Sequence, residues 1–270
     1  MKKRITGTFF ISAILTFIIA MLGTVSTIEY GDMTVLEFII TGKNKTSGSP
    51  PAVSGLSYAL TGTWFSILIP LLVSLPKLFP FSDCIQSGFW RFNTIRSGRN
   101  KFSFSCWLAV VLKGASAVTV GYFLYAIVII VAFPKNTDAA MYDFNPLCKL
   151  LECESVWGVT LFKMIILFIF SAMTASICIA LYVLTENKYK SIGIPLIIYY
   201  ILTSLSESIF RKTGNMKIHI ISPQNLIGSA DFWFESNFHI SFWFIPGVML
   251  AATIFLCIVY SKLMKRRLSV

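Results

Sequence analysis

Six apolar stretches dominate the 270-residue chain, and each is long enough to cross a lipid bilayer. They cover about residues 5–25, 57–80, 106–133, 159–184, 192–210 and 241–262. A helix needs about 20 apolar residues to span the hydrocarbon core, and stretches of this length are too long to be buried strands. Lipid offers the backbone no hydrogen-bond partners, so each stretch must be helical. The sequence therefore predicts an all-α membrane protein of six transmembrane helices in one domain, residues 1–270.

The composition supports this class of protein. Charged residues make up 13% of the chain and hydrophobic residues 56%, whereas a typical soluble domain carries about 25% charged residues. The first apolar stretch follows Lys2, Lys3 and Arg4, as the core of a signal peptide would. It is longer than such a core and no cleavage pattern follows it, so we expect it to be retained as a span.

The basic residues are distributed unevenly between the two sides of the predicted membrane. If the N-terminus is inside, 14 of the 23 Lys and Arg residues fall in inner segments and seven in the longer outer loops. Nine of the 12 acidic residues fall outside. By the positive-inside rule, we expect both termini to be cytoplasmic.

The longest inner loop lies between the second and third stretches and contains "SGFWRFNTIRSGRNKF", residues 87–102. It has no acidic residue, and its cations alternate with aromatic residues: Arg91, Arg96, Arg99 and Lys101 with Phe89, Trp90, Phe92 and Phe102. This pattern is typical of an amphipathic helix at a lipid interface or of a docking site for a partner protein. Four cations so near a bilayer make a poor groove for nucleic acid, so no nucleic-acid partner is expected.

The chain offers little sign of catalysis. The segment "ITGKNKTSG" lacks two requirements of a phosphate-binding loop, because Asn44 follows Lys43 and Glu37 stands where a glycine is needed. His219 and His239 both fall in the last outer loop, away from any nucleophile or paired carboxylate. The cysteines show no metal-binding spacing. We therefore predict no catalytic residue, no metal site and no cofactor in this chain.

The outer loops contain a short Gly, Ser and Pro segment and two cysteines. "TSGSPPAVSG", residues 46–55, has the composition of a loop. Cys148 and Cys153 share the second outer loop. They could form a disulfide outside the cell if the chain turns between them, or they could remain two free thiols.

Two charged residues fall within predicted spans near the outer side. Lys163 and Glu207 would lie at similar depth, which suggests an intramembrane pair between the fourth and fifth spans. The alternative is a local pair of Glu207 with Arg211, one turn along the same helix. Gly114 and Gly121 belong to a stripe of small residues on the third span, which favours close helix packing.

Residues 81–134 resemble the ABC-2 type permeases of Gram-positive bacteria. The shared pattern is an acid, Ser-Gly-aromatic, an Arg, Arg-x-Gly/Ser-Arg, a basic and aromatic step, and then a span rich in Gly and Ala. Its positions here are Asp83, Ser87, Gly88, Phe89, Arg91, Arg96, Gly98, Arg99, Lys101 and Phe102. The six spans, the cytoplasmic termini and the Pro-containing segment "ISPQNLI", residues 221–227, are also similar to that family.

The resemblance implies the membrane-spanning permease subunit of an ABC exporter in a bacterial plasma membrane. A coupling helix in the inner loop would dock on a separate ATPase subunit that binds ATP and Mg²⁺. Its contact residues would be Gly88, Phe89, Trp90, Arg91, Phe92, Arg96 and Arg99. Two permease subunits would be needed, identical or different, and the substrate would be a peptide, a lipid or an antibiotic-like compound, as in antimicrobial-peptide immunity. The alternative is a membrane scaffold or sensor that transports nothing and docks a cytoplasmic partner through the same loop.

Overall fold

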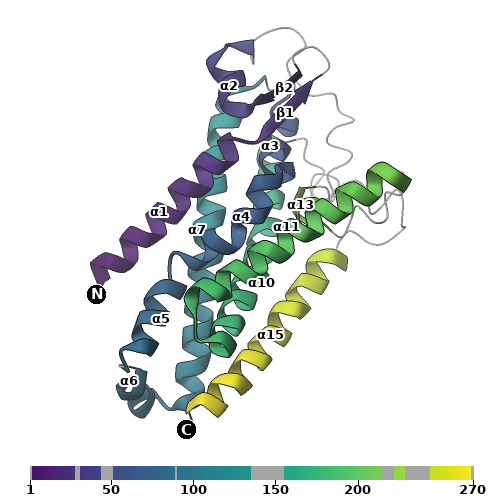
Figure 1. The fold of residues 1–270 in the computed structure, drawn as a ribbon. Coiled ribbons are helices and arrows are strands. Elements are labelled where there is room, and N and C mark those ends of the chain that lie inside the picture. The colour runs from purple at the N-terminus through teal and green to yellow at the C-terminus, as the bar shows by residue number, and fades with distance from the viewer. Residues whose placement is uncertain are drawn as a thin grey trace.

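The computed structural model describes residues 2–27, 31–43, 51–88, 90–134, 155–213, 222–228 and 244–268. Long helices lie alongside one another in this part of the chain, and a small β-hairpin lies at one end of them (Figure 1). In chain order the elements are α1 (Lys2–Met21), β1 (Thr24–Thr27), β2 (Gly31–Thr34), α2 (Val35–Ile40), α3 (Ala52–Thr61), α4 (Thr63–Ser74), α5 (Leu78–Gln86), α6 (Trp90–Ser97), α7 (Arg99–Ala132), α10 (Val156–Thr185), α11 (Lys188–Thr213), α13 (Pro223–Gly228) and α15 (Phe244–Leu268).

Four helices of the described residues are long and apolar enough to cross a membrane. They are Arg99–Ala132, Val156–Thr185, Lys188–Ile209 and Phe244–Arg266, and they match the last four predicted stretches. Helices α3 and α4 together form a fifth candidate, bent by 67° at the break between them. The described part of the chain therefore contains four spans by length and composition, or five if the bent pair is counted as one.

The predictions for the first two stretches need correction. α1 ends at Met21, where residues up to 25 were expected, and its apolar part, Gly7–Met21, is shorter than the four spans. The hairpin follows at once, with Thr24 opposite Thr34 and Thr27 opposite Gly31, so the described residues are not purely α-helical.

The stretch predicted as one helix over 57–80 is divided into three. Gly62 has an extended backbone, with φ −67° and ψ 123°, and it separates α3 from α4. The helix also starts earlier than expected, because Ala52–Gly55, predicted as loop, begins α3. Pro70 lies inside α4, while Pro76 lies in the turn before α5. One of the two breaks is thus at a glycine, which sequence reasoning had not singled out, and the other contains Pro76, which the sequence predicts as an interruption of this span.

Close backbone contacts fix α7 among its neighbours. A Cβ atom added to Gly114 would overlap the carbonyl oxygen of Val73 in α4, and one added to Gly121 would overlap that of Ala13 in α1. Only glycine lets the helix backbones approach this closely. The small-residue stripe predicted on this span is therefore confirmed as a packing feature.

Two buried tyrosines of α7 hold α3 in place. The Tyr122 hydroxyl donates a hydrogen bond to the Leu56 carbonyl at 2.8 Å, and the Tyr125 hydroxyl donates to the Gly55 carbonyl at 2.6 Å. Both tyrosine side chains are fully buried. A buried hydroxyl without a partner is costly, so these bonds favour one position of α3 against α7.

α10 and α11 form an antiparallel hairpin with a two-residue connection. Glu186 ends α10 in the left-handed conformation, with φ 55°. The Asn187 side chain then accepts hydrogen bonds from the backbone N–H groups of Tyr189, at 2.9 Å, and Lys190, at 3.2 Å. Asn187 therefore caps the first turn of α11, which closes the corner tightly.

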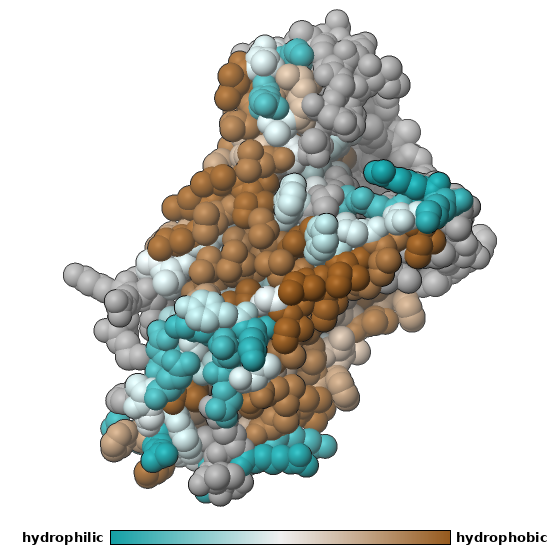
Figure 2. Space-filling model, viewed as in Figure 1, coloured by the Kyte–Doolittle hydropathy of each residue, from teal (hydrophilic) through white to brown (hydrophobic). Residues whose placement is uncertain are grey.

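The helices differ in how deeply they are buried within the helix bundle. In the apolar stretch of α10, 67% is buried, against 28% in α11 and 22% in α15. Figure 2 shows a broad apolar surface over α1 and α11, and polar residues gathered around α5 and the start of α11. Exposed apolar side chains over long helices are what contact with lipid requires.

Candidate functional site

The short helix α6 is set apart from its neighbours by two glycines. Gly88 precedes it with φ 73°, and Gly98 follows it with φ 79° and ψ 147°. The backbone at Gly98 is in a region that other residues hardly enter. Apart from the adjacent residues, no atom of the described residues lies within 4 Å of a Cβ added to either glycine, so both are needed for backbone conformation and not for space. They allow α6 to take a direction different from those of α5 and α7 (Figure 1).

One side of α6 packs inward. Trp90 contacts the core, and the Thr94 hydroxyl, one turn on, donates to the Trp90 carbonyl at 2.8 Å. The Arg91 guanidinium lies 5.7 Å from the centre of the Trp90 ring. Trp90 therefore anchors the helix and helps to orient Arg91.

The other side of α6 carries exposed side chains. Phe92 is 72% exposed and Ile95 is 84% exposed, and Arg91 and Arg96 are also exposed. Spacings of three and four residues place these side chains on neighbouring positions of one helix surface. Sequence reasoning missed Ile95, although its spacing of three from Phe92 was a usable signal.

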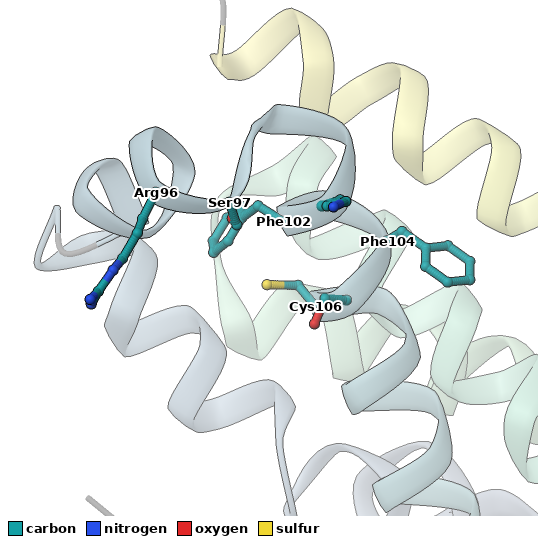
Figure 3. A pocket seen from close by; sticks show the side chains of 7 residues that line it. Arg96, Ser97, Phe102, Phe104 and Cys106 are labelled. Carbon is teal, nitrogen blue, oxygen red and sulfur yellow. The ribbon is translucent and has the colours of Figure 1, made fainter.

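A cavity of about 590 Å³ lies beside α6, where α7 begins. Its lining residues are Arg96, Ser97, Lys101, Phe102, Phe104, Ser105 and Cys106. Figure 3 shows Arg96 on one side and Phe104 on the other, with Phe102 and Cys106 between them. Phe104 is 51% exposed and its ring lies 5.9 Å from that of Trp107. Cations beside aromatic walls suit a partner segment that carries both apolar and acidic side chains.

The helix before α6 is fastened to the α10–α11 corner. The Lys188 ammonium lies 3.1 Å from the Asp83 carboxylate and 5.6 Å from the centre of the Phe79 ring. The Tyr182 hydroxyl donates to the Ser82 carbonyl at 3.2 Å. These contacts join α5 to the corner between α10 and α11.

The structure places most of the predicted docking residues at this end of the molecule. Trp90, Arg91, Phe92 and Arg96 are on α6, and Gly88 precedes it. Arg99 instead begins α7 and lines a different cavity, with residues of α15. Phe89 lies outside the described residues. The assignment of these residues to a docking site stays a prediction.

The remaining predicted sites are less well defined. Lys163 on α10 is 3% exposed and Glu207 on α11 is partly exposed. Their pairing stays a prediction. Cys148 and Cys153 lie outside the described residues. Within the described ranges, no three His, Cys, Asp or Glu side chains gather as metal ligands would.

No protein-family model, curated protein or solved structure matches the chain. Its function has to be argued from its residues and their geometry.

Proposed function

We propose that the chain is the membrane-spanning permease subunit of an ATP-driven ABC exporter and that α6 docks on its ATPase subunit. The observation that carries the proposal is the exposure of Phe92, Ile95 and Arg96 on a short helix held between two positive-φ glycines. This helix lies at the end of the long helices that could cross a membrane (Figure 1).

The physical basis is the chemistry of protein interfaces. Aromatic and arginine side chains supply most of the energy at the centres of such interfaces. Arg91 and Arg96 can each bind a partner carboxylate through two parallel hydrogen bonds. A separate helix presents these groups in a defined geometry, as a docking element should.

The connection from α5 to α10 and α11 offers a route for movement. The ATPase would bind ATP and Mg²⁺ and close, which would displace α6 and, through Asp83 and Lys188, the α10–α11 corner. Rigid-body shifts of this kind are a common switching device. A second permease subunit would complete the exporter in a bacterial plasma membrane, and the substrate would be a peptide, a lipid or an antibiotic-like compound, including an antimicrobial peptide.

A second candidate function uses the same exposed surface. A membrane scaffold or sensor would also need a docking helix such as α6, and its partner would have no ATPase activity. The identity of the partner therefore separates the two functions.

The experiment is co-purification of the chain in mild detergent with its natural neighbours, which tests whether a P-loop ATPase binds it. The triple variant Arg91→Ala/Phe92→Ala/Arg96→Ala should weaken ATPase binding at least tenfold, because each anchor in an interface centre contributes about 1 kcal/mol or more. The matched control is Tyr189→Ala/Lys190→Ala/Lys262→Ala, which also removes one exposed aromatic and two exposed cations. If ATPase binding and transport-dependent resistance survive the α6 variant, the proposal is wrong. A stable partner without ATPase activity would favour the scaffold.

A further inference from the structure

A second basic cavity lies where the beginning of α7 meets the end of α15. Its volume is about 430 Å³, and it is lined by Arg99, Asn100, Lys265 and Arg266. All four side chains are exposed. Three cations and one amide thus converge from two helices that are more than 150 residues apart in the sequence.

The two helices bring no negative charge to this cavity. Neither α7, Arg99–Ala132, nor α15, Phe244–Leu268, contains an acidic residue, and none of the described residues that line the cavity is acidic. The arginine and lysine groups, with the Asn100 amide, present hydrogen-bond donors that match phosphate oxygens.

The position of the cavity indicates which kind of phosphate-bearing molecule could bind there. α7 and α15 are both candidate membrane spans, so their adjoining ends lie at one membrane surface. On α15, Ile254 and Ile258 are 62% and 51% exposed and share a face with Lys265 at spacings of four and seven residues. On α7, Phe104 is 51% exposed, one turn from Asn100. Exposed apolar side chains next to a group of cations can bind a phospholipid, with the acyl chain on the apolar side chains and the anionic headgroup at the cations.

We propose that an anionic phospholipid binds with its phosphate in the cavity of Arg99, Asn100, Lys265 and Arg266 and with an acyl chain along Ile254 and Ile258. Such a lipid would neutralise the cations and hold the end of α15, a largely exposed helix, against α7. The inference depends on α7 and α15 spanning a membrane. It does not depend on ATPase docking.

The test is native mass spectrometry of the purified full chain, stripped of lipid and then supplied with phosphatidylglycerol or phosphatidylcholine. Wild-type protein should retain phosphatidylglycerol preferentially. Lys265→Gln/Arg266→Gln should weaken that binding by roughly 25-fold, about fivefold for each cation removed. Arg211→Gln/Lys212→Gln is the matched control, since it removes two adjacent exposed cations near the end of α11, and it should bind as wild type does.

Three outcomes overturn the inference. The first is an equal loss of phosphatidylglycerol binding in the two double glutamine variants. The second is equal retention of phosphatidylglycerol and phosphatidylcholine by the wild type. The third is displacement of phosphatidylglycerol by millimolar inorganic phosphate, which would indicate a small-anion site. The charge-preserving variant Lys265→Arg/Arg266→Lys should restore binding, and a lack of restoration also counts against the proposal. If the double glutamine variant does not fold, Lys265→Gln alone should still bind about fivefold more weakly. The number of bound lipids is measured without an ATPase. A negative result would therefore not count against the proposed function, which the co-purification experiment tests separately.

Discussion

Lys188 and Asp83 are 105 positions apart in the sequence, yet the lysine ammonium lies 3.1 Å from the aspartate carboxylate. The contact joins α5 to the first turn of α11. The Asp83 side chain is 65% exposed and that of Lys188 is 23% exposed. Water therefore screens the pair, and such pairs typically contribute about 0.2–1 kcal/mol.

We predict that Asp83→Asn lowers the free energy of unfolding by less than about 1 kcal/mol. If the chain is the proposed permease subunit, the same change should uncouple ATP hydrolysis from transport. The small stability change follows from solvent screening, and the functional change follows from the loss of the link between α5 and α11. The measurement is ATP hydrolysed per substrate exported, in vesicles that contain both subunits. Lys190→Gln, two residues from Lys188, is the control; equal ratios for the two variants would rule out a role for the pair.

Replacing Gly98 by alanine should destabilise the protein. A side chain in the backbone conformation of Gly98 costs about 1–3 kcal/mol, and nothing around the Cβ position relieves that cost. Gly193→Ala is the matched control within α11, because space is open there and φ is not positive. That change should stabilise the helix by about 0.5–1 kcal/mol. Thermal unfolding in detergent measures both changes in stability. Melting temperatures that shift in the same direction for the two variants would contradict the backbone conformation described for Gly98.

Gly121→Ala should separate α7 from α1. The new methyl group would overlap the Ala13 carbonyl, which belongs to the backbone and cannot rotate away. Overpacking of this kind costs about 1–3 kcal/mol. A lowered melting temperature and faster amide exchange in α1 are expected. Unchanged exchange in α1 would show that the helices are not in contact there.

Tyr125→Phe should loosen α3. The change removes the hydroxyl that donates to the Gly55 carbonyl at 2.6 Å, in a fully buried position. Loss of one buried hydrogen bond costs about 1 kcal/mol. Amide exchange over Ala52–Thr61 should rise, while Tyr200→Phe, at a side chain 53% exposed, should have no such effect. Equal exchange rates in the two variants would argue against the bond.

Single cysteines should show which ends of the helices face the cytoplasm. We expect Lys190→Cys and Arg96→Cys to react with a membrane-impermeable maleimide only in inside-out vesicles, and Thr41→Cys only in right-side-out cells. The native cysteines would first be replaced by serine. Reaction of Arg96→Cys and Thr41→Cys from the same side would contradict the predicted orientation.

The sequence predicted the long helices well because their apolar runs leave no alternative inside lipid. It failed at Gly62, since a lone glycine within an apolar run does not reveal that the chain bends there by 67°. It also ended the first span too late, because the run continues to Val25 while the hairpin pairing of β1 with β2 begins at Thr24. Tertiary pairing decided that boundary, and local hydrophobicity could not indicate it.

The segment predicted as the longest inner loop, residues 87–102, also has features that the sequence predicted and features that it could not predict. Gly88 and Gly98 could be identified from the sequence, but their positive φ values, which free the direction of α6, could not. The residues Arg91, Phe92 and Arg96 were visible as a basic and aromatic pattern. The meeting of Arg99 with Lys265 and Arg266 was not, because it depends on two helices far apart in the chain.

The corner at Glu186 and Asn187 sets the direction in which α11 leaves the end of α10. With 26 residues, α11 is about 39 Å long. Asn187 caps its first turn, and a hydrogen bond of 2.8 Å between the hydroxyls of Thr174 and Tyr199 ties its middle to α10. A rotation of about 10° at the corner would move the far end of α11 by about 7 Å, more than the rise of one helical turn. If α11 turned as one rigid body, a small shift beside Lys188 would therefore become much larger at the opposite end of the helix.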